Sequence, residues 1–187
     1  MDRLSASSAS KHMACHASAN LAAAIPNWTP PEIDPNANNA ANRGTAMHDT
    51  FASLMAVPVS DVKNFAEALA YVAEVRSRRR FQSMIEHELR VDWLQTKPST
   101  TADLVLYTQD EMHVLDLKTG KIPVSAVENP QLLYYAATYG FLAPKAKGVT
   151  LHIVQPWAGV MEEWYADAAT IQQFMLDAQA AELAITS

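Results

Sequence analysis

The chain has 187 residues, of which 49% are hydrophobic, and a mean hydropathy of -0.08, which together indicate one globular domain with a sizeable core. Its formal net charge of -6 argues against a protein that coats nucleic acid nonspecifically, but it does not exclude a nuclease, because an acidic metal site becomes locally positive once cations bind. No apolar run reaches the roughly 18 residues that span a bilayer, and the first residues lack the basic and apolar segments of a secretory signal. We therefore expect a cytoplasmic protein without a membrane segment.

The N-terminal part of the sequence predicts helices around one irregular segment. Residues 5–24 are rich in Ser and Ala and predict a helix with a Ser cap. Residues 26–42 contain four prolines and five asparagines and predict a loop, which we expect to be mobile. A short helix is expected over Arg43–Ala56, and Asp61 is expected to open another helix.

The rest of the chain predicts a mixed β-sheet flanked by helices, which is an α/β fold. Strands are expected over Met84–Leu94, Thr101–Tyr107, Glu111–Lys118, Gly148–Gln155 and Met161–Tyr165. Pro130 and Gly140 bound a helix over Gln131–Tyr139, and a closing helix is expected over Asp167–Ile185. We assign one domain over 1–187, with an N-terminal helical part over 1–60 and a sheet core over 84–165.

Two carboxylates fall on neighbouring strands of this core. Strand alternation places Asp103 on the face of Val105, and it places Asp116 and Lys118 on the face of Val114. An aspartate in an apolar strand is costly unless it is paired or bound to a metal. We interpret the two aspartates as ligands of a divalent metal, with Lys118 beside the reacting water. The alternative is a strand-end salt bridge between Asp103 and Lys118.

Further polar side chains could join this site. Gln131 and Tyr135 are four residues apart and share a helix face, although a capping glutamine with a core tyrosine is the alternative. Glu86 and Glu88 share one face of the first strand, and we favour Glu88 as an additional carboxylate. His48 ends a Gly-x-x-x-His pattern, but a single histidine on a short helix is usually structural or exposed.

One basic run stands out in this acidic chain, and it consists of Arg76, Arg78, Arg79 and Arg80. Cations near the end of a helix are favoured by the helix dipole, so one interpretation is a solvated helix C-terminus. The other interpretation is a patch that contacts DNA phosphates, together with Lys121.

Taken in order, these motifs resemble the PD-(D/E)XK nuclease superfamily. The motifs that carry the resemblance are Gly44-x-x-x-His48, a strand glutamate, Asp103, Asp116-x-Lys118 and Gln131-x-x-x-Tyr135. They are most similar to the RecB-like exonuclease branch, which includes the CRISPR-adaptation nucleases, and the run from Thr101 to Gly140 is similar to a phage-encoded group of that branch. The resemblance implies a restriction-endonuclease-like fold and a metal-dependent DNA nuclease, best matched by an exonuclease of phage recombination or DNA processing. A structure-specific endonuclease and an inactive DNA-binding or assembly protein of the same fold remain alternatives.

The resemblance also implies roles for individual residues. It implies that Mg²⁺ or Mn²⁺ is held by His48, Asp103, Asp116 and the backbone carbonyl of Leu117. It implies a catalytic group that comprises both aspartates, Lys118 to orient or deprotonate the attacking water, and the supporting residues Glu88, Gln131 and Tyr135.

Cofactor and partner expectations follow from the same resemblance. Relatives with an iron–sulfur cluster carry further cysteines, whereas Cys15 is the single cysteine here, so we expect no cluster. Thr100 occupies a position, three residues before Asp103, where the family usually has glycine. The expected partners are DNA and a phage single-strand annealing or binding protein, in the cytoplasm of a bacterial host. The oligomeric state is left open.

Overall fold

The computed structural model describes residues 4–15, 48–49 and 66–186. The loop predicted over 26–42, most of the helix predicted over Arg43–Ala56 and the predicted helix start at Asp61 lie outside the described residues. The described part of the first predicted helix forms a 3-10 turn, η1 (Ala6–Ser8), and a short helix, α1 (Ala9–Ala14).

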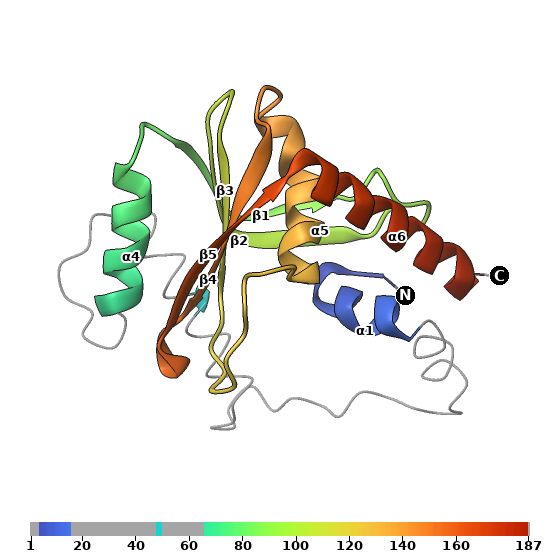
Figure 1. Ribbon diagram of the computed structural model, residues 1–187, viewed down its shortest axis with the longest axis horizontal. Coiled ribbons are helices and arrows are strands. Elements are labelled where there is room, and N and C mark those ends of the chain that lie inside the picture. The colour runs from blue at the N-terminus through green and yellow to red at the C-terminus, as the bar shows by residue number, and fades with distance from the viewer. Residues whose placement is uncertain (1–3, 16–47, 50–65, 187) are drawn as a thin grey trace.

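A five-stranded mixed sheet forms the centre of the protein (Figure 1). Its strands lie in the spatial order β1-β2-β3-β4-β5, and their bounds are Gln82–Arg90, Ser99–Tyr107, Met112–Leu117, Gly148–Gln155 and Val160–Asp167. Strands β3 and β4 are parallel, and the other neighbouring pairs are antiparallel. The carboxyl ends of β3 and β4 therefore lie at the same edge of the sheet. The predicted α/β fold with a mixed sheet is confirmed.

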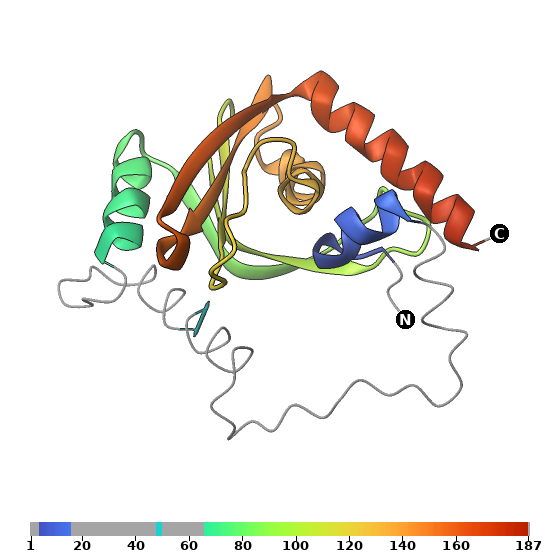
Figure 2. The same cartoon turned by 60° about the horizontal axis from the view of Figure 1, so that its bottom comes forward.

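Helices cover both faces of this sheet (Figures 1 and 2). Helix α5 (Pro130–Tyr139) connects β3 to β4 and packs with α1 and α6 (Ala168–Thr186) on one face, whereas α4 (Ala66–Ser77) covers the other. Asn129 caps α5 by accepting the backbone N–H groups of Gln131 and Leu132, and Pro130 occupies its first turn as predicted. None of the helices in the described part of the chain is long and apolar enough to cross a membrane.

Strand β3 divides the core into two layers. All six of its residues are buried, as expected for a central strand with a parallel neighbour. Met112 and Val114 pack in the layer of α5, and Leu115 and Leu117 pack in the layer of α4. The predicted alternation is therefore confirmed, and it places Asp116 on the side of α5.

The first strand is shorter than the predicted Met84–Leu94, because it ends at Arg90. The loop that follows is held by the carboxylate of Glu182 in α6, which accepts the N–H groups of Gln95 and Thr96 at 2.8 Å each. These contacts satisfy backbone groups that a longer strand would have paired. The local sequence does not reveal a partner about 87 residues away in the chain.

Gly148 is expected to tolerate no side chain. A Cβ atom at this position would lie 2.3 Å from the carbonyl oxygen of Ala166 and 2.6 Å from the hydroxyl of Tyr165. We expect Gly148→Ala to lower the free energy of unfolding by roughly 1–3 kcal/mol, because overpacked positions force the backbone to shift. Gly140→Ala is the matched control, since no atom of the described residues lies within 4 Å of its Cβ position. Chemical denaturation measures both, and equal stability of the two variants would contradict this explanation.

Candidate metal centre

Two acidic residues lie where the pairing of β1 with β2 is interrupted. The ladder pairs Ile85 with Leu104 and resumes at His87, so the break falls at Glu86 and Asp103. Glu86 has a φ of 44°, in the left-handed region that costs a non-glycine residue about 1 kcal/mol. Backbone outliers of this kind concentrate at functional sites.

Tyr139, the last residue of α5, supports this break. Its hydroxyl donates a hydrogen bond to the carbonyl of His87 and accepts one from the N–H of Ala102 at 3.2 Å. One hydroxyl therefore connects the backbones of β1 and β2 beside the break. Burial raises the pKa of Tyr139, which keeps the phenol protonated and able to donate.

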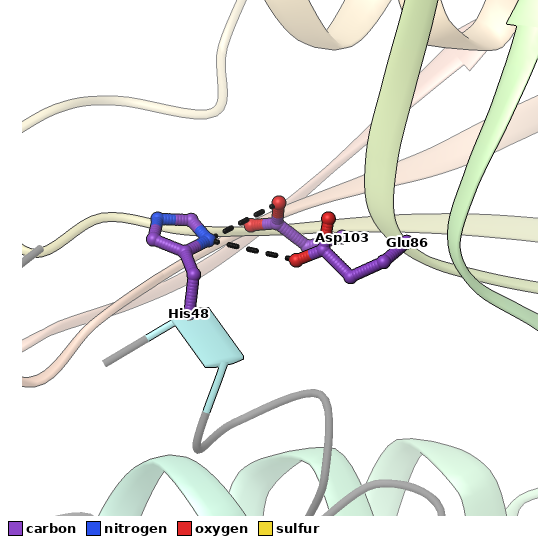
Figure 3. A group of neighbouring side chains, drawn as sticks. All are labelled: His48, Glu86 and Asp103. Carbon is purple, nitrogen blue, oxygen red and sulfur yellow. Dashed lines mark ion pairs between the residues drawn. The ribbon is translucent and has the colours of Figure 1, made fainter. Parts of the chain in front are cut away.

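His48, Glu86 and Asp103 form a group of ligand-type side chains (Figure 3). His48 Nδ1 lies 3.4 Å from Asp103 Oδ1 and 3.8 Å from Glu86 Oε1. Cis ligands of a six-coordinate Mg²⁺ or Mn²⁺ ion are about 3 Å apart, so small movements would close the group around an ion. The hydrogen bond to Asp103 raises the pKa of His48, against the opposing effect of burial.

Asp116 lies beside this group, and its burial makes it unusual. The residue is only 2% exposed, and its Oδ2 atom has no hydrogen-bond partner among the described residues. Lys118 Nζ lies 2.8 Å from that oxygen, so the contact is electrostatic without the geometry of a hydrogen bond. Burial, followed by the nearby Asp103 carboxylate, raises the pKa of Asp116 to about 6. A buried carboxylate oxygen in this state is a suitable ligand for a cation.

Asp103 connects β2 to β3 at the point where these strands separate. Backbone pairing between them extends to Leu104 and Leu115, and beyond it Asp103 Oδ2 accepts the N–H of Leu117 at 2.6 Å. The N–H and C=O groups of one strand residue point toward the same neighbouring strand. The Leu117 carbonyl therefore faces the side of Asp103, which suits the ligand role that the nuclease resemblance implies.

Lys118 begins a chain of polar contacts that runs into α5. Its Nζ donates to Gln131 Oε1 at 2.6 Å, and Gln131 Nε2 donates to Tyr135 Oη at 2.8 Å. Gln131 and Tyr135 share one helix face as predicted, and this face is turned toward the lysine. Lys118 forms its ion pair with Asp116, and not with Asp103 as the alternative interpretation had it.

The structure brings Glu86, and not the favoured Glu88, next to His48 and Asp103. The left-handed backbone at Glu86 interrupts the strand alternation, so the two glutamates do not share the same surroundings. Glu88 instead lines an open polar cavity of about 510 Å³ with Arg90 and Lys97. A sequence pattern gives no sign that a glutamate will adopt positive φ.

Two residues of the basic run are held by carboxylates. Arg78 forms ion pairs with two glutamates at 3.0 and 2.8 Å, and Arg79 pairs with Asp110 and Glu111 at 3.2 and 2.9 Å. Asp110 and Glu111 precede β3, whereas Asp116 lies near its end, so Arg79 is at the opposite end of β3 from Asp116. These contacts favour the interpretation of the run as a solvated helix end.

Gln155 supports the site in a way that the sequence interpretation missed. It is 1% exposed at the end of β4, and its side chain accepts the N–H of Val124 at 2.9 Å. The same amide donates to the carbonyls of Gly120 and Ile122 at 2.9 and 2.8 Å. It thereby fixes the loop that follows β3 and carries the exposed Lys121. The available signal was a glutamine at the end of an apolar strand.

Comparison with known proteins identifies the family of this chain. Residues 59–187, more than half of the chain, match a family model described as "Protein of unknown function (DUF2800)". The chain belongs to the DUF2800 family. The segment of this DUF2800 member that matches the model includes Glu86, Asp103, Asp116 and Lys118, and His48 lies outside it.

A solved structure described as "Crystal structure of SSO0001" is also similar to this DUF2800 protein. The similarity covers 71% of this chain and 66% of that one, at 17% sequence identity and a TM-score of 0.33. The chain therefore spans about two thirds of the length of that protein.

The raised pKa of Asp116 predicts how stability depends on pH. Between the ordinary pKa and the raised value, the folded state binds more protons than the unfolded state, so stability falls as the pH rises through about 4 to 6. We expect Asp116→Asn to melt about 5 °C higher than the wild type at about pH 7 in chelator, and the difference to shrink toward about pH 4.

Asp110→Asn is the control for this measurement, because hydrogen bonds from Thr108 and Arg79 lower the pKa of Asp110. That variant should not gain stability at neutral pH. A melting temperature for Asp116→Asn equal to or below that of the wild type at neutral pH would show that the carboxylate is not destabilising.

The two glutamates of β1 provide a matched pair for testing the metal group. We expect Glu86→Gln to weaken Mn²⁺ binding about 10-fold or more, because Glu86 lies within the ligand group. Glu88→Gln should bind Mn²⁺ like the wild type. Isothermal titration calorimetry with MnCl₂ measures both, and equal affinities for the two variants would remove Glu86 from the group.

Proposed function

We propose that this protein is a metal-dependent DNA nuclease of the PD-(D/E)XK type, which hydrolyses phosphodiester bonds. One observation carries the proposal: a buried Asp116 oxygen that receives no hydrogen bond from the described part of the chain contacts Lys118 and lies beside the His48–Glu86–Asp103 group. A carboxylate that needs a cation and a lysine that is not a ligand are the two parts that such hydrolysis requires.

The residues present fit Mg²⁺ or Mn²⁺. The side chains of His48, Glu86 and Asp103 offer one imidazole and two carboxylates, and Asp116 and the Leu117 carbonyl add oxygen donors beside them. Oxygen donors suit both ions, and imidazole favours Mn²⁺. When bound, the ion would lower the pKa of a water molecule and stabilise negative charge on the attacked phosphate. The proposal includes no iron–sulfur cluster.

Lys118 supplies a fixed positive charge next to this group. Its ammonium is held between Asp116 and Gln131, so its position is set before substrate arrives. The Gln131 amide has a defined orientation, because its oxygen accepts from Lys118 and its nitrogen donates to Tyr135. Burial raises the pKa of Tyr135 far above its ordinary value, so the phenol stays neutral and adds no negative charge. The ammonium is therefore placed to stabilise a phosphate in the transition state.

The motif order and the resemblance favour an exonuclease that acts on linear DNA in phage recombination or DNA processing. Such an enzyme would work in the cytoplasm of a bacterial host, and a phage single-strand annealing or binding protein is its proposed partner. The endonuclease alternative differs in one measurable property, which is cleavage of covalently closed circles.

The decisive assay uses end-labelled linear DNA and closed circular DNA with Mg²⁺ or Mn²⁺. We expect the wild type to degrade linear DNA progressively, faster with Mn²⁺, and to spare the circles. Lys118→Ala should lower turnover about 100-fold while Mn²⁺ affinity changes little, because the lysine acts on charge and is not a ligand. Lys145→Ala is the matched control, since Lys145 is exposed and contacts Gln109 in the turn between β2 and β3.

Three results would contradict parts of this proposal. A wild type that cleaves neither substrate with either ion would reject the nuclease. Rapid cleavage of closed circles would replace the exonuclease with the endonuclease. Loss of Mn²⁺ binding by Lys118→Ala, with unchanged turnover per bound ion, would remove the proposed role of the lysine.

A further inference from the structure

Two large hydrophobic side chains are exposed beyond the carboxyl ends of the parallel strands β3 and β4. Ile122, in the loop after β3, is 83% exposed, and Trp157, in the turn between β4 and β5, is 53% exposed. Both views of the fold place this loop and this turn side by side, at the end of the sheet where the cyan segment of residues 48–49 lies (Figures 1 and 2). Exposed apolar side chains that gather beside a polar site commonly mark a binding surface.

The backbone around both residues is fixed by hydrogen bonds. Gln155, buried at the end of β4, donates to the carbonyl of Ile122 at 2.8 Å. Trp157 lies in a 3-10 turn, η4 (Pro156–Ala158), which is closed by the N–H of Gly159 donating to Pro156 at 3.1 Å. Gly159 has a φ of 65°, a conformation that glycine adopts without strain. The backbone that carries the two exposed side chains is therefore already ordered by hydrogen bonds. Binding would then lose less conformational entropy than it would on a flexible loop.

The charges around these side chains suit a nucleic acid strand. Lys121 is exposed and directly precedes Ile122, and Lys118 lies three residues earlier in the same loop. The carboxylate of Glu162 in β5 accepts the N–H of Ala126 in this loop at 2.6 Å, so part of its negative charge is compensated by that hydrogen bond. Aromatic and apolar surfaces beside ammonium groups are the combination by which proteins bind single strands, through stacked bases and contacted phosphates.

We propose that Trp157 and Ile122 form a stacking surface for unpaired bases of a DNA strand that enters the metal centre, with Lys121 contacting its phosphates. The inference rests on the proposed nuclease function for its substrate class. Base faces are accessible in a single strand or a frayed end and are hidden in an intact duplex. The surface would therefore select unpaired ends, which is a specificity that the metal group alone does not provide.

The test compares a fluorescent single-stranded oligonucleotide of about 12 nucleotides with an abasic strand of the same length. Fluorescence anisotropy is measured with Ca²⁺ in place of Mg²⁺. Because the coordination of Ca²⁺ is more flexible than the octahedral geometry of Mg²⁺, we expect Ca²⁺ to support DNA binding without cleavage. Trp157→Ala should bind the normal strand about 10-fold more weakly and the abasic strand as tightly as the wild type. Trp157→Phe should restore most of the loss. Phe141→Ala, which removes another exposed hydrophobic side chain in the 3-10 turn η3 (Gly140–Leu142), should bind like the wild type.

The outcomes separate this inference from the nuclease proposal. Equal weakening on normal and abasic strands, or normal binding by Trp157→Ala, would overturn the stacking surface, even if the wild type cleaves DNA. Normal binding by Trp157→Ala would instead indicate that this surface contacts a protein partner. Base-dependent binding that needs Trp157, in a protein that cleaves nothing, would keep the stacking surface and reject the nuclease.

Discussion

The structure around the candidate site depends on one buried carboxylate. Asp116 lies in a strand whose six residues are all buried, and its pKa is raised because burial and Asp103 both disfavour its charge. Lys118 reduces this cost, because its ammonium approaches Asp116 to 2.8 Å. One oxygen of Asp116 still lacks a hydrogen bond from any residue that the structure describes. The buried carboxylate therefore destabilises the fold at a place where a bound cation would offset its charge.

A second source of destabilisation, a strained backbone, lies near Asp116. Helix α5 contacts both places. Glu86 adopts positive φ at the break between β1 and β2, where the hydroxyl of Tyr139 connects the two strands. Tyr139 ends α5, and Gln131 in the first turn of the same helix holds Lys118. A ten-residue helix is about 15 Å long, so α5 can reach both halves of the site. The distance between the metal group and the lysine therefore depends on how α5 packs on the sheet.

The parts of this arrangement that the sequence predicts are those that local periodicity determines. Alternation in β3 predicted the faces of Asp116 and Lys118, and helical spacing predicted that Gln131 and Tyr135 share a face. The contributions of Glu86, Tyr139 and Gln155 depend instead on a left-handed residue and on partners in other elements, which periodicity does not encode. The ion pairs of Arg78 and Arg79 reach partners as many as 85 residues away, so the basic run alone did not reveal that its charges are compensated.

The distribution of charge explains why apolar contacts would matter for a DNA substrate. The chain carries a net charge of -6, and two of its arginines are neutralised by carboxylates at the end of the sheet far from the candidate metal site. Long-range attraction for DNA is therefore weak, and attraction from Lys121 extends only about 8 Å at physiological salt. Stacking does not depend on counterion release, so it would retain a strand where phosphate contacts are few. On the proposed function, the bound cation and the Trp157 surface would together supply the contacts that hold the strand.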